Sequence, residues 1–156
     1  MSQDIDVSII IPVYNGVPYL EKCINSLEKQ NHNLLRIEIL FIDDASEDNS
    51  VEYIKSFNLK NIKIIKSKTN KGPSAARNIG IKNALGEYIF FQDVDDNIEN
   101  NALETLFSKA KYYNSDFVFS DHKRIEDLKD QRENRYDFNE EVVFSKEKII
   151  QAMKNE

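Results

Sequence analysis

Three aspartates stand close together in the middle of the chain, at Asp93, Asp95 and Asp96, directly after the apolar run Tyr88–Phe91. Asp93 and Asp95 are two residues apart, so in extended chain their carboxylates project from the same side and repel each other. Carboxylate oxygens suit Mg²⁺ or Mn²⁺, which complete their shell with water and substrate phosphate. The pattern therefore favours a divalent metal site that neutralises a diphosphate, with a solvated turn as the simpler alternative.

A tyrosine and a pair of aspartates follow two earlier apolar runs. Tyr14 ends the run Val7–Val13, where its ring can lie against a nucleobase or pack on its neighbours. Asp43 and Asp44 end the run Ile37–Ile42, and carboxylates beside a buried strand are costly unless they are hydrogen-bonded or bind a ligand. A carboxylate there can accept the imide N–H of uracil or a ribose hydroxyl, or Asp44 can cap the following helix. Contacts to a nucleoside and purely structural roles in packing and capping therefore both remain open for these residues.

The segment Asn70–Gly80 is typical of a tight turn that leads into a helix. Gly72 permits a sharp turn, Pro73 suits the first helical position, and Ser74 can cap the helix. The amino terminus of a helix offers N–H groups and a positive dipole end to an anion. Arg77 lies one turn inside, where it can reach a phosphate, hold the aspartates in place, or remain a surface arginine.

Alternating strands and helices must position these residues. Apolar runs rich in β-branched residues alternate with segments of helical period. Strands are expected at 7–13, 37–42, 62–65, 88–91 and 117–119, and helices at 18–30, 51–57, 74–85 and 103–110. Apolar strands in this order predict an α/β fold with a mostly parallel central sheet, flanked by helices on both faces. Ligands bind at the carboxyl ends of such strands, where the residues above fall.

The composition is that of an ordinary globular protein and argues against several partners. The 156 residues fit one domain, and a net charge of −6 argues against binding to nucleic acid. No stretch approaches the roughly 20 apolar residues of a transmembrane helix, and the amino terminus lacks the features of a signal peptide. Cys23 is the only cysteine, which excludes an internal disulfide and favours the reducing cytoplasm.

The pattern weakens after Ser120. Ten of the fifteen residues 121–135 are charged, which is typical of a solvated loop or a disordered segment. Residues 138–144 could form a short strand, and residues 145–153 a last helix.

Together, these motifs resemble family 2 glycosyltransferases. The matching stretches are VSIIIPVYN at 7–15, IDDAS at 42–46, NKGPSAARN at 70–78 and GEYIFFQDVDD at 86–96. The resemblance extends from about residue 6 to residue 120, and it implies a Rossmann-like GT-A fold. Residues 1–120 are then the nucleotide-sugar-binding core, and residues 121–156, with their charged loop and helix, begin an acceptor-side region.

The resemblance also implies a nucleoside-diphosphate sugar donor, often a UDP-sugar, and Mn²⁺ or Mg²⁺ as the cofactor. The residues that would contact the nucleotide are Pro12, Val13, Tyr14, Asp43, Asp44, Gly72, Arg77 and Asp93. Pro12 and Tyr14 would flank the base, while Asp44 or its neighbour Asp43 would bond uracil.

The stretch Asp93-Val94-Asp95 matches the DXD motif of the family. By resemblance, Asp93 contacts ribose or sugar, while Asp95 and Asp96 meet the metal together with Asp93. Gln92 stands where the family commonly has an apolar residue.

No catalytic residue can be assigned within the chain. Members of the family place a general base, an Asp or Glu, well beyond the DXD motif, and proton removal by such a group contributes about 10²- to 10⁴-fold. Glu140 and Glu141 stand in an uninformative context. The base is therefore expected outside this chain, in a larger enzyme. The resemblance implies inverting transfer to a saccharide or lipid-linked acceptor of a bacterial surface polysaccharide, in the cytoplasm at the inner face of the plasma membrane.

Other functions remain to be weighed. A donor-binding module without turnover would carry the same motifs. A nucleotidyltransferase normally has a glycine-rich, basic phosphate-binding loop after the first strand. In this chain residues 14–18 occupy that position and include no basic residue, which disfavours this alternative. A phosphoacceptor receiver domain is disfavoured, because Lys66-Ser67-Lys68 stands where its phosphorylated aspartate belongs.

Overall fold

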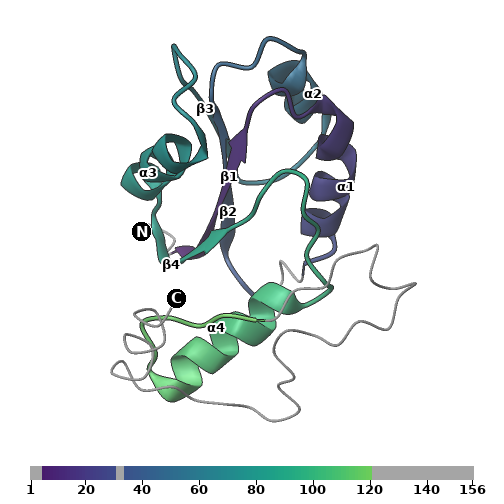
Figure 1. The fold of residues 1–156 in the computed structure, drawn as a ribbon. Helices are drawn as coiled ribbons and strands as arrows, with labels where there is room; N and C mark the ends of the chain where they lie inside the picture. Colours follow the sequence, from purple (N-terminus) through teal and green to yellow (C-terminus); the bar gives the residue numbers. More distant parts are fainter. Residues whose placement is uncertain (1–4, 31–33, 121–156) are drawn as a thin grey trace, which may run out of the picture. The chain divides into compact units, whose positions relative to one another are not determined.

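The computed structural model describes residues 5–30 and 34–120. Residues 1–118 form one compact unit and residues 119–156 a second, of which only Phe119 and Ser120 are described. The described elements (Figure 1) are β1 (Ile5–Val13), α1 (Val17–Glu28), β2 (Ile37–Asp43), α2 (Ser50–Ser56), β3 (Ile62–Lys66), α3 (Pro73–Asn83), β4 (Gly86–Phe91) and α4 (Ala102–Tyr113). The strand predicted at 138–144 and the helix predicted at 145–153 lie outside the described residues.

The strands of the described residues form one parallel sheet in the order β3-β2-β1-β4. The first strand lies inside the sheet, so Ile10 pairs with Leu40 on one side and with Phe91 on the other. Every residue of β2 is buried, as expected for a parallel strand that is covered on both faces. The predicted α/β fold with a parallel central sheet is confirmed.

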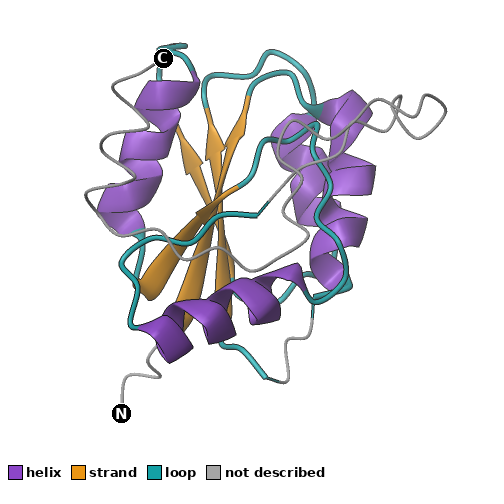
Figure 2. Ribbon diagram, turned by 60° about the horizontal axis from the view of Figure 1, so that its bottom comes forward, coloured by secondary structure: helices purple, strands orange, loops and turns teal. Residues whose placement is uncertain are grey.

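Helices cover both faces of this sheet (Figure 2). On one face, Ala76 of α3 packs in a cluster with Ile10. On the opposite face, Leu20 and Ile24 of α1 pack in a larger cluster with Ile9. Neighbouring residues of β1 enter different clusters because successive side chains of a strand point to opposite faces. No helix in the described part of the chain is long and apolar enough to cross a membrane.

The fourth helix packs against β4, the edge strand of the described sheet. The Phe107 ring meets the Tyr88 ring edge-on, with centroids 5.8 Å apart. Lys111 forms an ion pair of 2.7 Å with Glu87, and the Tyr88 hydroxyl donates to the Ser115 carbonyl at 3.1 Å. These contacts anchor the chain again after it leaves β4, so the segment that joins β4 to α4 is fixed at both ends.

Two local predictions are wrong. Residues 117–119 form no strand, and Phe117 is 60% exposed. Three apolar residues need a neighbouring strand to form a ladder, and among the described residues β4 pairs only with β1. Ser74 does not cap α3 either, because the helix already begins at Pro73 and the cap position falls on Gly72.

Candidate functional site

The residues predicted from the strand ends meet around one cavity of about 320 Å³ at the carboxyl edge of the sheet. Those of the predicted nucleotide and metal contacts that line it are Pro12, Val13, Tyr14, Asp44, Gly72, Arg77, Asp93 and Asp95. Asp43 and Asp96 are not among the lining residues. Asn70, Pro73 and Val94 also line the cavity. They were not predicted as site residues, although all three lie within the motifs that carried the prediction.

The loop after β1 presents Tyr14 at the rim of the cavity, with 47% of the residue exposed. The next residue, Asn15, has a φ of 50°, a left-handed conformation that asparagine tolerates better than most residues. Its side-chain oxygen accepts the Glu47 N–H at 2.8 Å, and its own N–H donates to the Ser46 hydroxyl at 3.0 Å. The loop is therefore fixed from the β2–α2 connection, and the Tyr14 ring is available to stack on a planar ligand.

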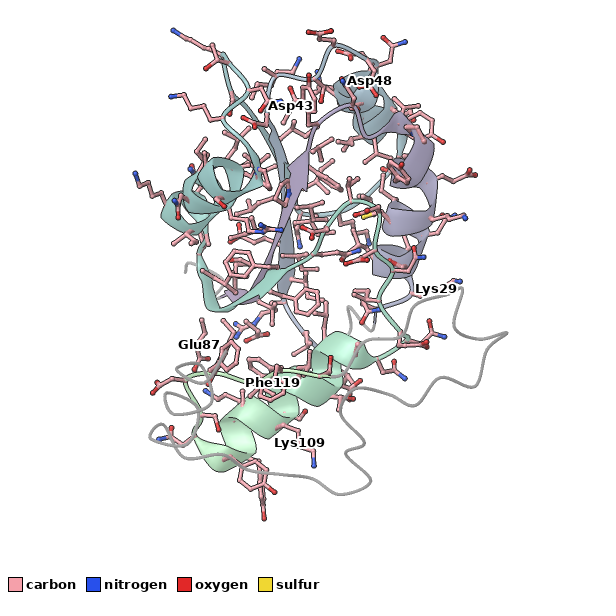
Figure 3. The ribbon with its side chains drawn as sticks, viewed as in Figure 1. Lys29, Asp43, Asp48, Glu87, Lys109 and Phe119 are labelled. Carbon is pink, nitrogen blue, oxygen red and sulfur yellow. The ribbon has the colours of Figure 1, made fainter. Side chains whose placement is uncertain are left out.

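Asp48 ties the same two loops together. Its carboxylate accepts the N–H of Val17 at 3.2 Å and the N–H of Ser50 at 3.0 Å. Burial raises the pKa of Asp48, but hydrogen bonds from the Ser50 hydroxyl and from these backbone groups outweigh it and hold the pKa below its ordinary value of 3.8. Figure 3 shows Asp48 at the same end of the sheet as Asp43.

Replacing Asp48 by alanine is expected to lower the free energy of unfolding at pH 7 by about 1–2 kcal/mol, because bonds to a charged acceptor are lost. The folded-state pKa is depressed, so this stability is present above pH 3.8 and disappears as the pH falls through the folded-state pKa. Urea unfolding of both proteins between pH 7 and pH 3 should show curves that converge at acid pH. A gap that stays constant over that range would contradict the assignment.

The two adjacent aspartates at the end of β2 form different hydrogen bonds. Asp44 is 3% exposed, and one of its oxygens accepts the N–H groups of Lys71 at 3.0 Å and Gly72 at 2.7 Å. Because a carboxylate has about four acceptor positions, Asp44 can hold this turn and still accept a bond from a ligand in the cavity that it lines. The Asp43 carboxylate instead accepts the Ser46 N–H at 3.3 Å and shapes the turn after the strand.

The turn before α3 and the first turn of that helix bring the backbone of Gly72 and the guanidinium group of Arg77 to the cavity wall. Gly72 has a φ of 86°, a conformation that side-chain-bearing residues rarely adopt. It lines the cavity with Pro73, so the amino terminus of α3 borders the site. One turn further, the Arg77 guanidinium donates to the Asp93 carboxylate and forms an ion pair with it. Arg77 thus holds the acidic turn in place, one of the roles predicted for it.

The acidic residues form a tight turn directly after β4. The Asp96 N–H donates to the Asp93 carbonyl at 3.1 Å, and Val94 packs against the apolar cluster of α1. The turn thereby places Asp93 and Asp95, but not Asp96, on the cavity wall.

The donor set of this turn fits a metal that is shared with a ligand. Within residues 5–30 and 34–120, no group of three or more His, Cys, Asp or Glu side chains could hold a metal ion by itself. Mg²⁺ and Mn²⁺ do not require one, because these ions are commonly held by one or two carboxylates together with water and substrate phosphate oxygens. Asp93 and Asp95 supply such a partial, oxygen-only set on the cavity wall.

Comparison with known proteins gives a family match and several relatives. The model of glycosyl transferase family 2 matches residues 8–156. The glycosyltransferase GlyA of Streptococcus pneumoniae is 38% identical over 78% of this chain and 17% of its own length. A poly(ribitol-phosphate) β-glucosyltransferase of Bacillus spizizenii is 38% identical over 76% of this chain and 19% of its own length.

A solved structure shares the fold. The crystal structure of residues 1–349 of Staphylococcus aureus TarS in complex with UDP superposes with a TM-score of 0.68 and 33% identity. The match covers 71% of this chain and 33% of that one. The chain therefore spans a third or less of these similar proteins.

Proposed function

This chain belongs to glycosyl transferase family 2, and on that premise we propose that it forms the donor-binding part of a glycosyltransferase. The enzyme would transfer a sugar from a nucleoside-diphosphate sugar, a UDP-sugar, to a glycan or lipid-linked acceptor of a bacterial cell-surface polymer. The observation that carries the proposal is the single cavity in which an aromatic ring, a buried carboxylate, an arginine and two further carboxylates meet. The TarS complex with UDP and the poly(ribitol-phosphate) β-glucosyltransferase support the donor and the class of acceptor.

The cavity offers each part of a UDP-sugar a chemically matched group. The exposed Tyr14 ring stacks on the uracil, whose other contacts come from Pro12 and Val13. The Asp44 carboxylate accepts the imide N–H of uracil, an interaction that favours uracil over bases without a donor at that position. The Asp93 carboxylate accepts a hydrogen bond from a hydroxyl group of the ribose or of the sugar. Arg77 and the amino terminus of α3 lie where they balance the charge of the diphosphate.

We assign Mn²⁺ or Mg²⁺ to Asp95, with Asp93 as the second carboxylate and Asp96 behind them in the turn. When bound, the ion would neutralise the diphosphate and stabilise it as the leaving group. The residues of the acidic turn hold the two carboxylates on the cavity wall, and the turn keeps Asp93 near Arg77.

The proposed reaction is a single displacement at the anomeric carbon. An acceptor hydroxyl attacks opposite the nucleotide, the bond to the diphosphate oxygen breaks, and the configuration inverts. The acceptor proton passes to a general base that we place beyond the described residues, where Glu140 and Glu141 also lie. We place the enzyme in the cytoplasm, at the inner face of the plasma membrane, as the resemblance to the family implies.

Titration calorimetry of UDP into this chain tests the proposal. We expect binding in the presence of Mn²⁺, and much weaker binding when EDTA replaces the metal, because the diphosphate would then face the Asp95 carboxylate with no metal ion between them. UMP should bind with little response to Mn²⁺, since it lacks the β-phosphate. A folded chain with no metal-dependent affinity for a nucleoside diphosphate would overturn the proposal. Binding without release of UDP from a UDP-sugar and acceptor would instead identify a donor-binding module without turnover.

A further inference from the structure

A buried glutamine lies between β4 and the acidic turn. Gln92 is 3% exposed, and its backbone N–H donates to the Ile10 carbonyl at 3.1 Å. It is therefore the point at which the chain leaves the sheet ladder and enters the turn that carries Asp93 and Asp95.

The side chain of Gln92 spans this turn. Its amide nitrogen donates to the Asp96 carbonyl at 3.2 Å, while the Asp96 N–H bonds back to the Asp93 carbonyl at 3.1 Å. The two bonds brace the turn from its beginning to its end. A turn with the backbone bond alone would leave the peptide groups around Asp95 freer to rotate.

The second contact of the amide nitrogen is weaker. It lies 3.4 Å from the sulfur of Cys23 on α1. Burial, together with the charges of Asp96 and Asp95, raises the pKa of Cys23 to about 12, so the sulfur is an uncharged thiol and a poor acceptor. The bond to the Asp96 carbonyl is therefore the one that orients the amide.

The amide is not explained by stability alone. Its oxygen has no hydrogen-bond partner among the described residues, and a buried acceptor without a partner opposes folding. An apolar side chain of similar length would fill the same space without that cost. What it would lack is the bond that closes the acidic turn.

We propose that Gln92 is a positioning residue, which acts through the bond to Asp96 to hold the Asp93 and Asp95 carboxylates in the orientation that a diphosphate-bound divalent metal requires. The inference rests on the proposed function. It assigns a role to a residue that touches neither the donor nor the metal.

Gln92→Met tests this role, because methionine keeps the length of the side chain and removes the amide. The chain offers a matched control in Gln30, which is also 3% exposed and whose amide nitrogen bonds the carbonyls of Ser26 at 3.1 Å and Glu99 at 3.0 Å. Gln30→Met makes the same chemical change in another buried backbone-bridging site. A second variant, Gln92→Leu, repeats the loss of the amide with a different shape.

The quantity to measure is the ratio of UDP affinities with Mn²⁺ and with EDTA. Outer partners of a metal site typically change metal affinity by 10- to 100-fold, so we expect about a 10-fold smaller ratio for Gln92→Met and Gln92→Leu. Affinity in EDTA should stay the same, because the base contacts are untouched. Gln30→Met should retain the full ratio even if its melting temperature falls further than that of Gln92→Met.

A second readout needs no ligand. Hydrogen exchange of the Asp96 amide should be faster in Gln92→Met than in the unchanged chain and in Gln30→Met, because the bond to Asp93 loses its brace. If the unchanged chain binds no UDP, the proposed function fails. If it binds UDP in a metal-dependent way but both Gln92 variants keep the full ratio or the Asp96 exchange rate is unaltered, only the role of Gln92 is overturned. An equal loss of the affinity ratio in Gln30→Met would also overturn the role of Gln92, because general destabilisation would then be enough to explain the loss.

Discussion

Asp95→Ala is expected to abolish the metal-dependent part of UDP binding. Partners outside the first coordination shell already change metal affinity by about 10- to 100-fold, so removing a direct carboxylate ligand should cost at least about 100-fold. In EDTA the variant should bind UDP as well as the unchanged chain or better, because a carboxylate that repels the diphosphate has gone. Calorimetric titrations of UDP with Mn²⁺ and with EDTA give both quantities for one protein.

Asp96→Ala is the matched control for this prediction. Asp96 stands next to Asp95 but does not line the cavity, and its backbone N–H and carbonyl take part in the hydrogen bonds of the turn. Alanine keeps both groups, so the metal response should fall much less than in Asp95→Ala. The reverse ranking of the two variants would place the metal on the other side of the turn and would contradict the site proposed above.

The grouping of the cavity residues could be predicted from local sequence. Tyr14, Asp44 and Asp93 each follow a buried strand, and the carboxyl ends of parallel strands meet at one edge of a sheet. The order of strands and helices thus sufficed to bring together residues separated by up to about eighty positions in the chain. It could not say which oxygen faces a ligand and which faces the protein.

The task of individual side chains depends on contacts that no local pattern encodes. Asp44 accepts backbone N–H groups of Lys71 and Gly72, more than 25 residues later in the chain. The amide of Gln92 finds a partner four residues ahead only because a turn folds back on it. Likewise, the run at 117–119 has the apolar composition of a strand, but a strand also needs a paired neighbour, and these residues pair with no strand of the described sheet.

The role of Gly86 also could not be predicted from local sequence. Its place after the helix expected at 74–85 suggests only that it ends that helix. In the structure it begins β4, where it pairs with Ile5. A Cβ at this position would lie 2.5 Å from the backbone nitrogen of Ser8 and 2.8 Å from the carbonyl carbon of Val7. The Gly86 N–H also donates to the Ser8 hydroxyl at 2.8 Å, and that hydroxyl donates to the buried Glu38 at 2.5 Å. The glycine thus permits a close approach of two backbones.

Gly86→Ala is therefore expected to lower the free energy of unfolding by about 3 kcal/mol, the upper end of the usual cost of overpacking, because the clashing atoms belong to the backbone of β1 and cannot rotate away. Without the clash, the substitution would raise the free energy of unfolding, since alanine is favoured over glycine inside a strand by about 0.5–1 kcal/mol. Urea unfolding measures the difference.

Gly16→Ala is the control for this last substitution. A Cβ there would lie 2.9 Å from a Val13 methyl group and 3.3 Å from a Val94 methyl group, and none of its nearest contacts is a backbone atom, so the loss should be smaller, about 1 kcal/mol. Because β4 carries the acidic turn, Gly86→Ala should also weaken the Mn²⁺-dependent binding of UDP. A Gly86→Ala protein as stable as the unchanged chain would mean that β4 does not lie against β1 in this register, and the placement of Asp93 and Asp95 on the cavity wall would fall with it.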